Sequence, residues 1–145
     1  MSNTRIMFAT LALGTAITFA GPAFAEKLKA TLDSASEVPP NNSAGKGTAD
    51  IDYDAAAKKL SWKLTYSGLS GNATAAHFHG PAEAGKNAGV AIWISEKGKP
   101  FESPFKGSAT LTDAQAADLQ NGLWYVNVHT AANPGGEVRG QLMKS

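Results

Sequence analysis

Short runs in which apolar and polar residues alternate make up most of the chain after residue 25. Strict alternation with a period of two predicts strands that have one buried and one solvated face. Clusters of Gly, Pro, Asn and Ser between the runs predict turns, as in an antiparallel sheet. The three clearest runs have apolar faces made of Leu28, Ala30 and Leu32; of Ala49, Ile51 and Tyr53; and of Leu60, Trp62 and Leu64. We expect the second and third runs to pair as a hairpin.

Further strands are predicted at 75–79, 90–94, 106–110, 124–130 and 137–143, which gives about eight strands, enough for two packed sheets. One short helix is expected between strands, because Thr112 followed three residues later by Gln115 fits a capping box. Asn121-Gly122 would end that helix. The pattern therefore predicts an all-β antiparallel sandwich or barrel of Greek-key type with one short helix.

The first 25 residues differ from the rest and are typical of a secretory signal peptide. Arg5 supplies the positive start, residues 6–20 are almost entirely apolar, and Ala23-Phe24-Ala25 offers a small-x-small cleavage site. The alternative is a retained anchor, but the apolar run is shorter than the roughly 20 residues that cross a bilayer. We expect cleavage before Glu26 and a periplasmic or secreted product, with residues 26–145 forming one domain.

Composition and charge narrow the range of functions. The chain has no cysteine, so it can form neither a disulfide framework nor a thiolate metal site. Once Arg5 is removed with the signal segment, 12 basic and 12 acidic residues remain, with no basic stripe. We expect no nucleic-acid partner and, after signal cleavage, no membrane association. No phosphate-binding glycine loop, serine elbow or cysteine nucleophile is present, so no catalytic residue is assigned.

Two of the three histidines form a His-x-His pair. His77 and His79 are two positions apart on a predicted strand, so both imidazoles project from one face while Phe78 points the other way. Since Phe78 suits the core, the two histidines are expected on the outward face of the sheet.

The third histidine lies on another predicted strand with the same arrangement. In the run 124–129, Trp124, Val126 and Val128 form the apolar face, which leaves Tyr125, Asn127 and His129 on the opposite one. If the two histidine strands are neighbours, all three rings converge at one point on the sheet surface.

Three neutral imidazoles on a rigid surface can bind copper, zinc or nickel, with a fourth position open to water or an anion. Copper is preferred because affinity for nitrogen sites peaks at copper, and zinc is the second choice. The metal ligands are therefore predicted to be His77, His79 and His129. The alternative is that surface histidines bind nothing and the His-x-His pair serves a structural hydrogen bond.

The last predicted strand places polar residues near this site. Val138 and Leu142 belong inward, so Glu137, Arg139 and Gln141 are expected to face outward, beside the histidines. Glu137 could accept a hydrogen bond from a ligand imidazole, or form a surface ion pair with Arg139.

Four ordered motifs resemble the pattern of the CHRD family, a module first described in the secreted signalling antagonist chordin. The resemblance covers nearly all of the chain after residue 25, and its opening is matched as well, at 37–40 and 45–49. The motifs are AHFHGPA at 76–82, Leu111-Thr112 with Gln115 and Leu119, YVNVHT at 125–130, and NPGGEVRGQ at 133–141.

The resemblance implies an immunoglobulin-like or Cu/Zn superoxide dismutase-like sandwich. Dismutases carry a His-x-His pair on the outer face of their sheet, which supports copper at the three histidines. It does not extend to dismutase activity, because this chain lacks a fourth histidine for copper, the disulfide and the zinc ligands.

Three functions remain open at this point. The first is an exported copper-binding protein that handles or stores copper. The second is a protein-interaction module, in which the loops around Gly80-Pro81 and Asn133-Pro134 form a binding surface. The third is a copper-dependent redox enzyme resembling superoxide dismutase. Exposed imidazoles could also be shared across a two-fold axis, so a metal-linked homodimer stays possible.

Overall fold

The computed structural model describes residues 24–145, and most of them lie in antiparallel strands. The predicted signal segment falls almost wholly outside the described residues. The elements are β1 (Glu26–Asp33), β2 (Lys46–Asp54), β3 (Lys59–Ser67), β4 (Ala73–His79), β5 (Val90–Trp93), β6 (Phe105–Thr110), α1 (Asp113–Gln120), β7 (Tyr125–Thr130), β8 (Val138–Gln141) and β9 (Met143–Lys144).

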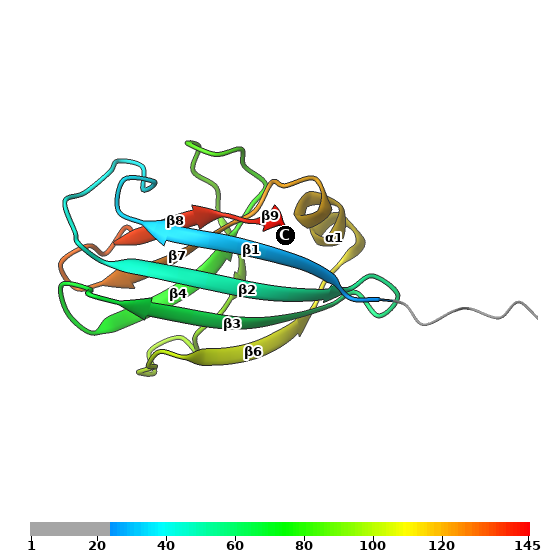
Figure 1. Cartoon of the computed structure of the whole chain (residues 1–145), viewed down its shortest axis with the longest axis horizontal. Helices are drawn as coiled ribbons and strands as arrows, with labels where there is room; N and C mark the ends of the chain where they lie inside the picture. Colours follow the sequence, from blue (N-terminus) through cyan, green and yellow to red (C-terminus); the bar gives the residue numbers. More distant parts are fainter. Residues whose placement is uncertain (1–23) are drawn as a thin grey trace, which may run out of the picture.

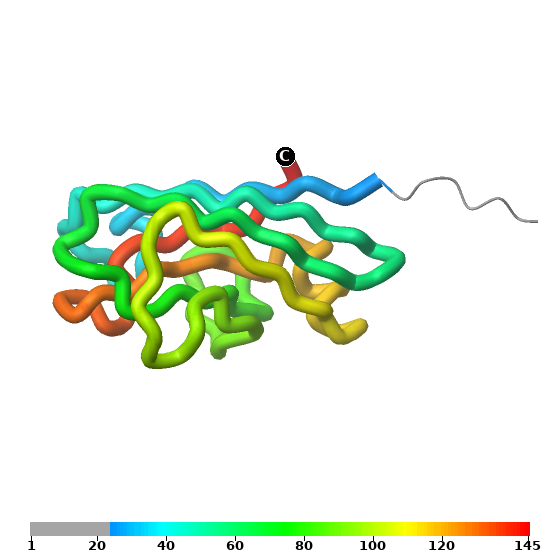
Figure 2. The backbone as a smooth tube through the Cα atoms, turned by 90° about the horizontal axis from the view of Figure 1, so that it is seen from below, coloured from blue at the N-terminus to red at the C-terminus, as the bar shows by residue number. Residues whose placement is uncertain are grey.

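The strands form one continuous sheet that folds over into two layers (Figures 1 and 2). The strand order is β5-β4-β7-β8-β1-β2-β3-β6, and β9 pairs with β1. The layer of β1, β2, β3 and β6 covers the layer of β4, β5, β7 and β8. The predicted all-β antiparallel sandwich is confirmed. The two layers are joined where β1 meets β8, at the pair Asp33 and Arg139.

The core lies between the layers and is built from the alternating apolar residues. The predicted hairpin of β2 and β3 forms, with Ile51 opposite Trp62, and both side chains are buried. Across the core, the ring of Trp62 meets that of Phe78 edge to face, with the ring centroids 5.3 Å apart. Burying side chains of this size contributes roughly 1.5–3 kcal/mol each. The core therefore fixes β4 from its inner face, and with it the direction of the histidines on its outer face.

The helix α1 closes one end of the sandwich (Figure 1). Its predicted capping box is confirmed: Gln115 donates its backbone N–H to the hydroxyl of Thr112, whose own N–H is accepted by the Gln115 side chain. The backbone N–H of Asn121 caps the other end. No helix within residues 24–145 is long and apolar enough to cross a membrane.

Candidate metal centre

The two histidine strands are direct neighbours, as the predicted site requires. β4 and β7 pair antiparallel, with His77 opposite Asn127 and Ala75 opposite His129. The ring centroid of His77 lies 4.8 Å from that of His129 and 5.4 Å from that of His79. The three imidazoles therefore gather at one place on the outer side of the β4–β7 layer.

The ring nitrogens are close enough to share one ion. His77 Nδ1 lies 3.0 Å from His129 Nε2. Each of the three rings offers one nitrogen, and these nitrogens lie within 4.8 Å of one another. Because metal–imidazole bonds are about 2.0–2.1 Å long, two nitrogens on one tetrahedral ion stand about 3.3 Å apart. The pair His77 and His129 is already near that spacing.

Two backbone carbonyls set which nitrogen is free on two of the rings. His129 Nδ1 lies 2.8 Å from the carbonyl oxygen of Pro134, and His79 Nδ1 lies 3.0 Å from that of Ala88. A carbonyl oxygen only accepts hydrogen bonds, so both Nδ1 atoms carry the proton and donate. In the neutral rings, Nε2 of His79 and Nε2 of His129 keep their lone pairs. Hydrogen bonds of this kind commonly orient metal-binding histidines.

The expectation of an open surface site is wrong. His77 is 7% exposed and His79 is 8% exposed, and His129 is partly buried. Strand alternation correctly assigned the face but could not show that loops fold over it. The segment from Gly80 to Gly89 covers His79 through Ala88, and the turn containing Pro134 covers His129.

Burial also keeps the rings neutral. It is the largest cause of the lowered pKa of His77, which falls to about 4, with further lowering by His129 and His79. Burial lowers the pKa values of His79 and His129 as well, against the opposing effect of their carbonyl partners. Near neutral pH the cluster therefore presents unprotonated imidazoles, which is the form that binds metal.

A stack of three side chains supports His79 from one side. The ring of Tyr125 lies parallel to that of His79 with centroids 4.8 Å apart, and the guanidinium carbon of Arg139 lies 3.5 Å from the centroid of the Tyr125 ring. Arg139 also donates to the side chain of Asn87 and to the carbonyl of Lys86, so it anchors the covering loop. Sequence analysis placed Tyr125 on the correct face but gave it no role.

Glu137 does neither of the things predicted for it. It is completely buried, and one carboxylate oxygen accepts the backbone N–H of Ser70 at 2.9 Å. Burial raises the pKa of Glu137, but contacts with the Ser43 hydroxyl, with the N–H and hydroxyl of Ser70 and with the Thr130 hydroxyl together hold that pKa below its ordinary value. Its role is to hold the β3–β4 loop, and Arg139 is occupied by Tyr125 and the covering loop instead of pairing with it. Alternation along β8 could not reveal which loops would cover its outer face.

A carboxyl group that sequence analysis missed lies against Asn127, the neighbour of His79. Glu37, in the loop after β1, is 5% exposed, and its pKa rises to about 7 because burial outweighs the attraction of Arg139 and a contact with Asn127. Its Oε1 is buried without a hydrogen bond of ordinary geometry. A Cβ at Gly136 would stand 2.4 Å from this oxygen and 2.7 Å from Asn127 Nδ2, so glycine there leaves the space that both groups occupy. The resemblance of residues 37–40 to the opening of the CHRD pattern was the one feature of the sequence that pointed to Glu37.

Trp93 closes the outer side of His77. It lies opposite His77 across the β4–β5 pair, and its ring meets the imidazole edge to face with centroids 4.1 Å apart. Its side chain is nevertheless 43% exposed. An indole that is half in solvent and in contact with a candidate ligand can report on metal binding by its fluorescence.

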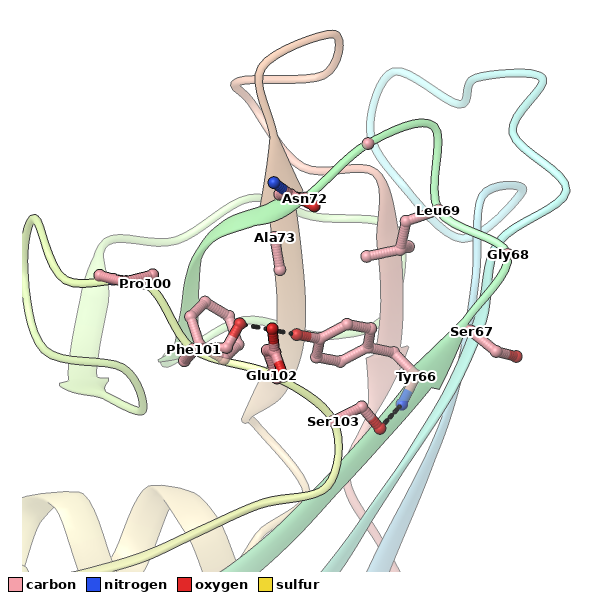
Figure 3. Close-up of a pocket in the computed structure, with 11 residues that line it drawn as sticks. Tyr66, Ser67, Gly68, Leu69, Asn72, Ala73, Pro100, Phe101, Glu102 and Ser103 are labelled. Carbon is pink, nitrogen blue, oxygen red and sulfur yellow. Dashed lines mark hydrogen bonds between the residues drawn. The ribbon is translucent and has the colours of Figure 1, made fainter.

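One cavity of the described residues lies away from the histidines. Its volume is about 400 Å³, and it lies between the β3–β4 loop and the segment before β6 (Figure 3). Tyr66 spans one wall and donates its hydroxyl to the carbonyl of Phe101, at 3.1 Å. None of the three histidines lines it, so the candidate chemistry lies elsewhere.

Fold and site together define a class: an antiparallel β-sandwich that carries a covered cluster of three neutral imidazoles. The family model of the CHRD domain matches residues 28–142, so the chain belongs to the CHRD family. No curated protein and no solved structure matches the chain. The family membership predicted from the sequence motifs is thus confirmed.

Proposed function

We propose that this chain is an exported copper-binding protein that holds one copper ion through His77 Nδ1, His79 Nε2 and His129 Nε2, and that handles or stores copper outside the cytoplasm. The observation that carries the proposal is the convergence of three neutral imidazoles, two of them with the proton fixed on the nitrogen that faces away from the centre. Nitrogen ligands without thiolates favour copper over the other divalent ions, with zinc next.

The covered position of the site favours holding a metal over rapid turnover. His77 and His79 are buried, with Trp93 against the ring of His77 and Ala88 of the segment from Gly80 to Gly89 against that of His79. A copper ion at this point would be protected by the protein, as storage or delivery requires. Redox chemistry on an external substrate would need an open coordination position that the substrate reaches.

The proposal is tested by metal titration of the protein expressed as the full chain. We expect one equivalent of Cu(II), bound more tightly than Zn(II) by calorimetry, with nitrogen hyperfine structure from three imidazoles in the paramagnetic resonance spectrum. Replacing His77, His79 or His129 by Ala should weaken binding more than about 100-fold, since loss of a supporting partner alone costs about 10–100-fold. Glu83→Ala, in the exposed loop, is the control and should bind as the parent does.

Weak binding by the parent protein, or three alanine variants that still bind tightly, would refute the copper site and leave the interaction module as the better hypothesis. Export is tested separately. The product should be recovered outside the cytoplasm, and its intact mass should be that of a chain beginning at Glu26.

A further inference from the structure

The third ligand differs from the other two in how its free nitrogen is used. His77 Nδ1 and His129 Nε2 face each other, so a metal ion can replace the contact between them. His79 Nε2 instead lies 2.9 Å from the side-chain amide oxygen Oδ1 of Asn127. The lone pair of Nε2 lies in the ring plane, and it serves either this hydrogen bond or a metal ion. Copper can therefore reach His79 only by displacing Asn127.

The amide of Asn127 can satisfy this nitrogen in the metal-free protein. Because His79 Nδ1 donates to Ala88, a neutral ring needs a donor at Nε2. The oxygen Oδ1, which faces Nε2 in the structure, can only accept, so it does not satisfy a lone pair there. A half-turn of the amide exchanges its oxygen and nitrogen and puts an N–H of Asn127 toward the imidazole. The amide oxygen then faces Glu37, whose raised pKa allows a protonated carboxyl that donates to it.

The surroundings hold Asn127 in this position. Its backbone pairs with His77 on one side and with Arg139 on the other, and the residue is 3% exposed. Glu37 lies against its amide, and the absence of a side chain at Gly136 makes room for both groups. Only rotation of the Asn127 side chain can release His79.

We propose that Asn127, backed by Glu37, is a latch on the third metal ligand, so that copper first binds His77 and His129 and gains His79 in a second step. The proposal rests on the copper site proposed above. Asn127 is then a positioning residue that sets how fast and how tightly the metal is held. It competes with the metal and does not ligate it.

The experiment follows the binding of Cu(II) to the full-chain product by stopped-flow fluorescence, since Trp93 contacts His77. Wild type should show a fast phase that depends on copper concentration, and a slower phase that does not. Asn127→Val places a residue that favours strands at this position and removes the amide. It should accelerate the slow phase and tighten copper binding roughly 2- to 10-fold, the range expected for one net hydrogen bond. Asn127→Ala should act in the same direction, and Asn72→Ala, in an exposed loop, should change nothing.

An unchanged slow phase, or weaker binding in both Asn127 variants, would overturn the latch, because Asn127 would then support the ligand. A second measurement separates this from failure of the copper site. In the metal-free protein, the side-chain ¹⁵N shift of His79 Nε2 should move in Asn127→Val, while the His129 shifts stay in place. No movement at His79 refutes the latch, whereas movement in a protein that does not bind copper refutes the copper proposal alone.

Discussion

His77 Nδ1 and His129 Nε2 face each other 3.0 Å apart across the β4–β7 pair. Because His129 Nδ1 keeps its proton and donates it in a hydrogen bond to the carbonyl oxygen of Pro134, its Nε2 can only accept. In the metal-free protein the bridging proton therefore belongs to His77 Nδ1. His77 Nε2 then carries no proton, only a lone pair, and this nitrogen is buried without a hydrogen-bond partner.

Metal binding should reverse the tautomer of His77. To ligate through Nδ1, the ring must move its proton to Nε2, while His129 keeps its proton on Nδ1. We expect long-range ¹H–¹⁵N spectra of the metal-free protein to show protonated Nδ1 on both rings. Saturation with diamagnetic Zn(II) should shift the proton to Nε2 on His77 alone. Protonated Nε2 on His77 before metal is added would contradict this prediction.

The metal-free protein should lose stability in mild acid because of the same cluster. The pKa of His77 is about 4 in the folded state against 6.5 for an unperturbed histidine. As the pH falls from 6.5 to 4, His77 is protonated in the unfolded chain but stays neutral in the folded protein. The free energy of unfolding therefore decreases. This single group accounts for a decrease of the order of 3 kcal/mol.

The measurement is urea denaturation of the metal-free protein at several pH values between 4 and 8. His77→Gln should show a shallower decrease over that window than wild type does. Equal slopes for the two proteins would mean that His77 titrates normally in the folded state.

Glu37 should affect the pH dependence of stability in the opposite direction to His77. Its folded pKa is about 7 against 4.5 for the ordinary carboxyl, so the folded protein retains a proton that the unfolded chain loses. This contribution to stability is present below pH 4.5 and is lost as the pH rises through 7, by an amount of the order of 3 kcal/mol. Glu37→Gln cannot ionise and should gain stability relative to wild type between pH 5 and 8, in the same urea experiment.

Glu83→Gln serves as the control for that comparison, since Glu83 is exposed. This exposed substitution should change the free energy of unfolding little. A difference between Glu37→Gln and wild type that stays constant with pH would show that the Glu37 carboxyl is ionised normally in the folded protein.

Gly136→Ala should destabilise the protein and weaken metal binding together. The added Cβ would meet Glu37 Oε1 at 2.4 Å, and the backbone φ of +129° disfavours any side chain. A cost of about 1–3 kcal/mol is expected, from thermal or urea unfolding. Gly135→Ala is the matched control, because no atom lies within 4 Å of its Cβ position, and it should cost far less. Equal effects of the two changes would contradict the close packing of Glu37 and Asn127 at this point.

Sequence reasoning recovered the parts of the molecule that depend on local pattern. Period-two alternation placed Leu60, Trp62 and Leu64 in the core, and the capping box of Thr112 and Gln115 marked the helix. It also placed His77 and His79 on one face, because side-chain direction in a strand depends on position alone. The convergence with His129 needed one further condition, the pairing of β4 with β7, which the motifs did not state.

Burial of the site could not be predicted in the same way. The cover over His79 comes from loop contacts such as that of Ala88 with both His79 and Tyr125, and these depend on loop conformation. Glu37 reaches the site from a segment 90 positions away from Asn127 in sequence, so no local pattern connects the two. Alternation assigned Glu137 to the outer face but not its burial beneath a loop. Local patterns thus predict strand faces, while the surroundings of a site depend on tertiary contacts.

Phe78 links the core to the metal centre, because it lies between the two histidines of β4 and points to the opposite face. Its ring packs against Trp62 and, with centroids 5.8 Å apart, against Trp124. Phe78→Ala should lower the free energy of unfolding by about 3–5 kcal/mol, as expected for an aromatic residue removed from a packed core. The cavity would also loosen the strand, so we expect weaker copper binding although no ligand is changed. Thr74→Ala, exposed on the same strand, should alter neither quantity. Undiminished copper affinity in a destabilised Phe78→Ala would show that the histidines are held by their loops and not by the core.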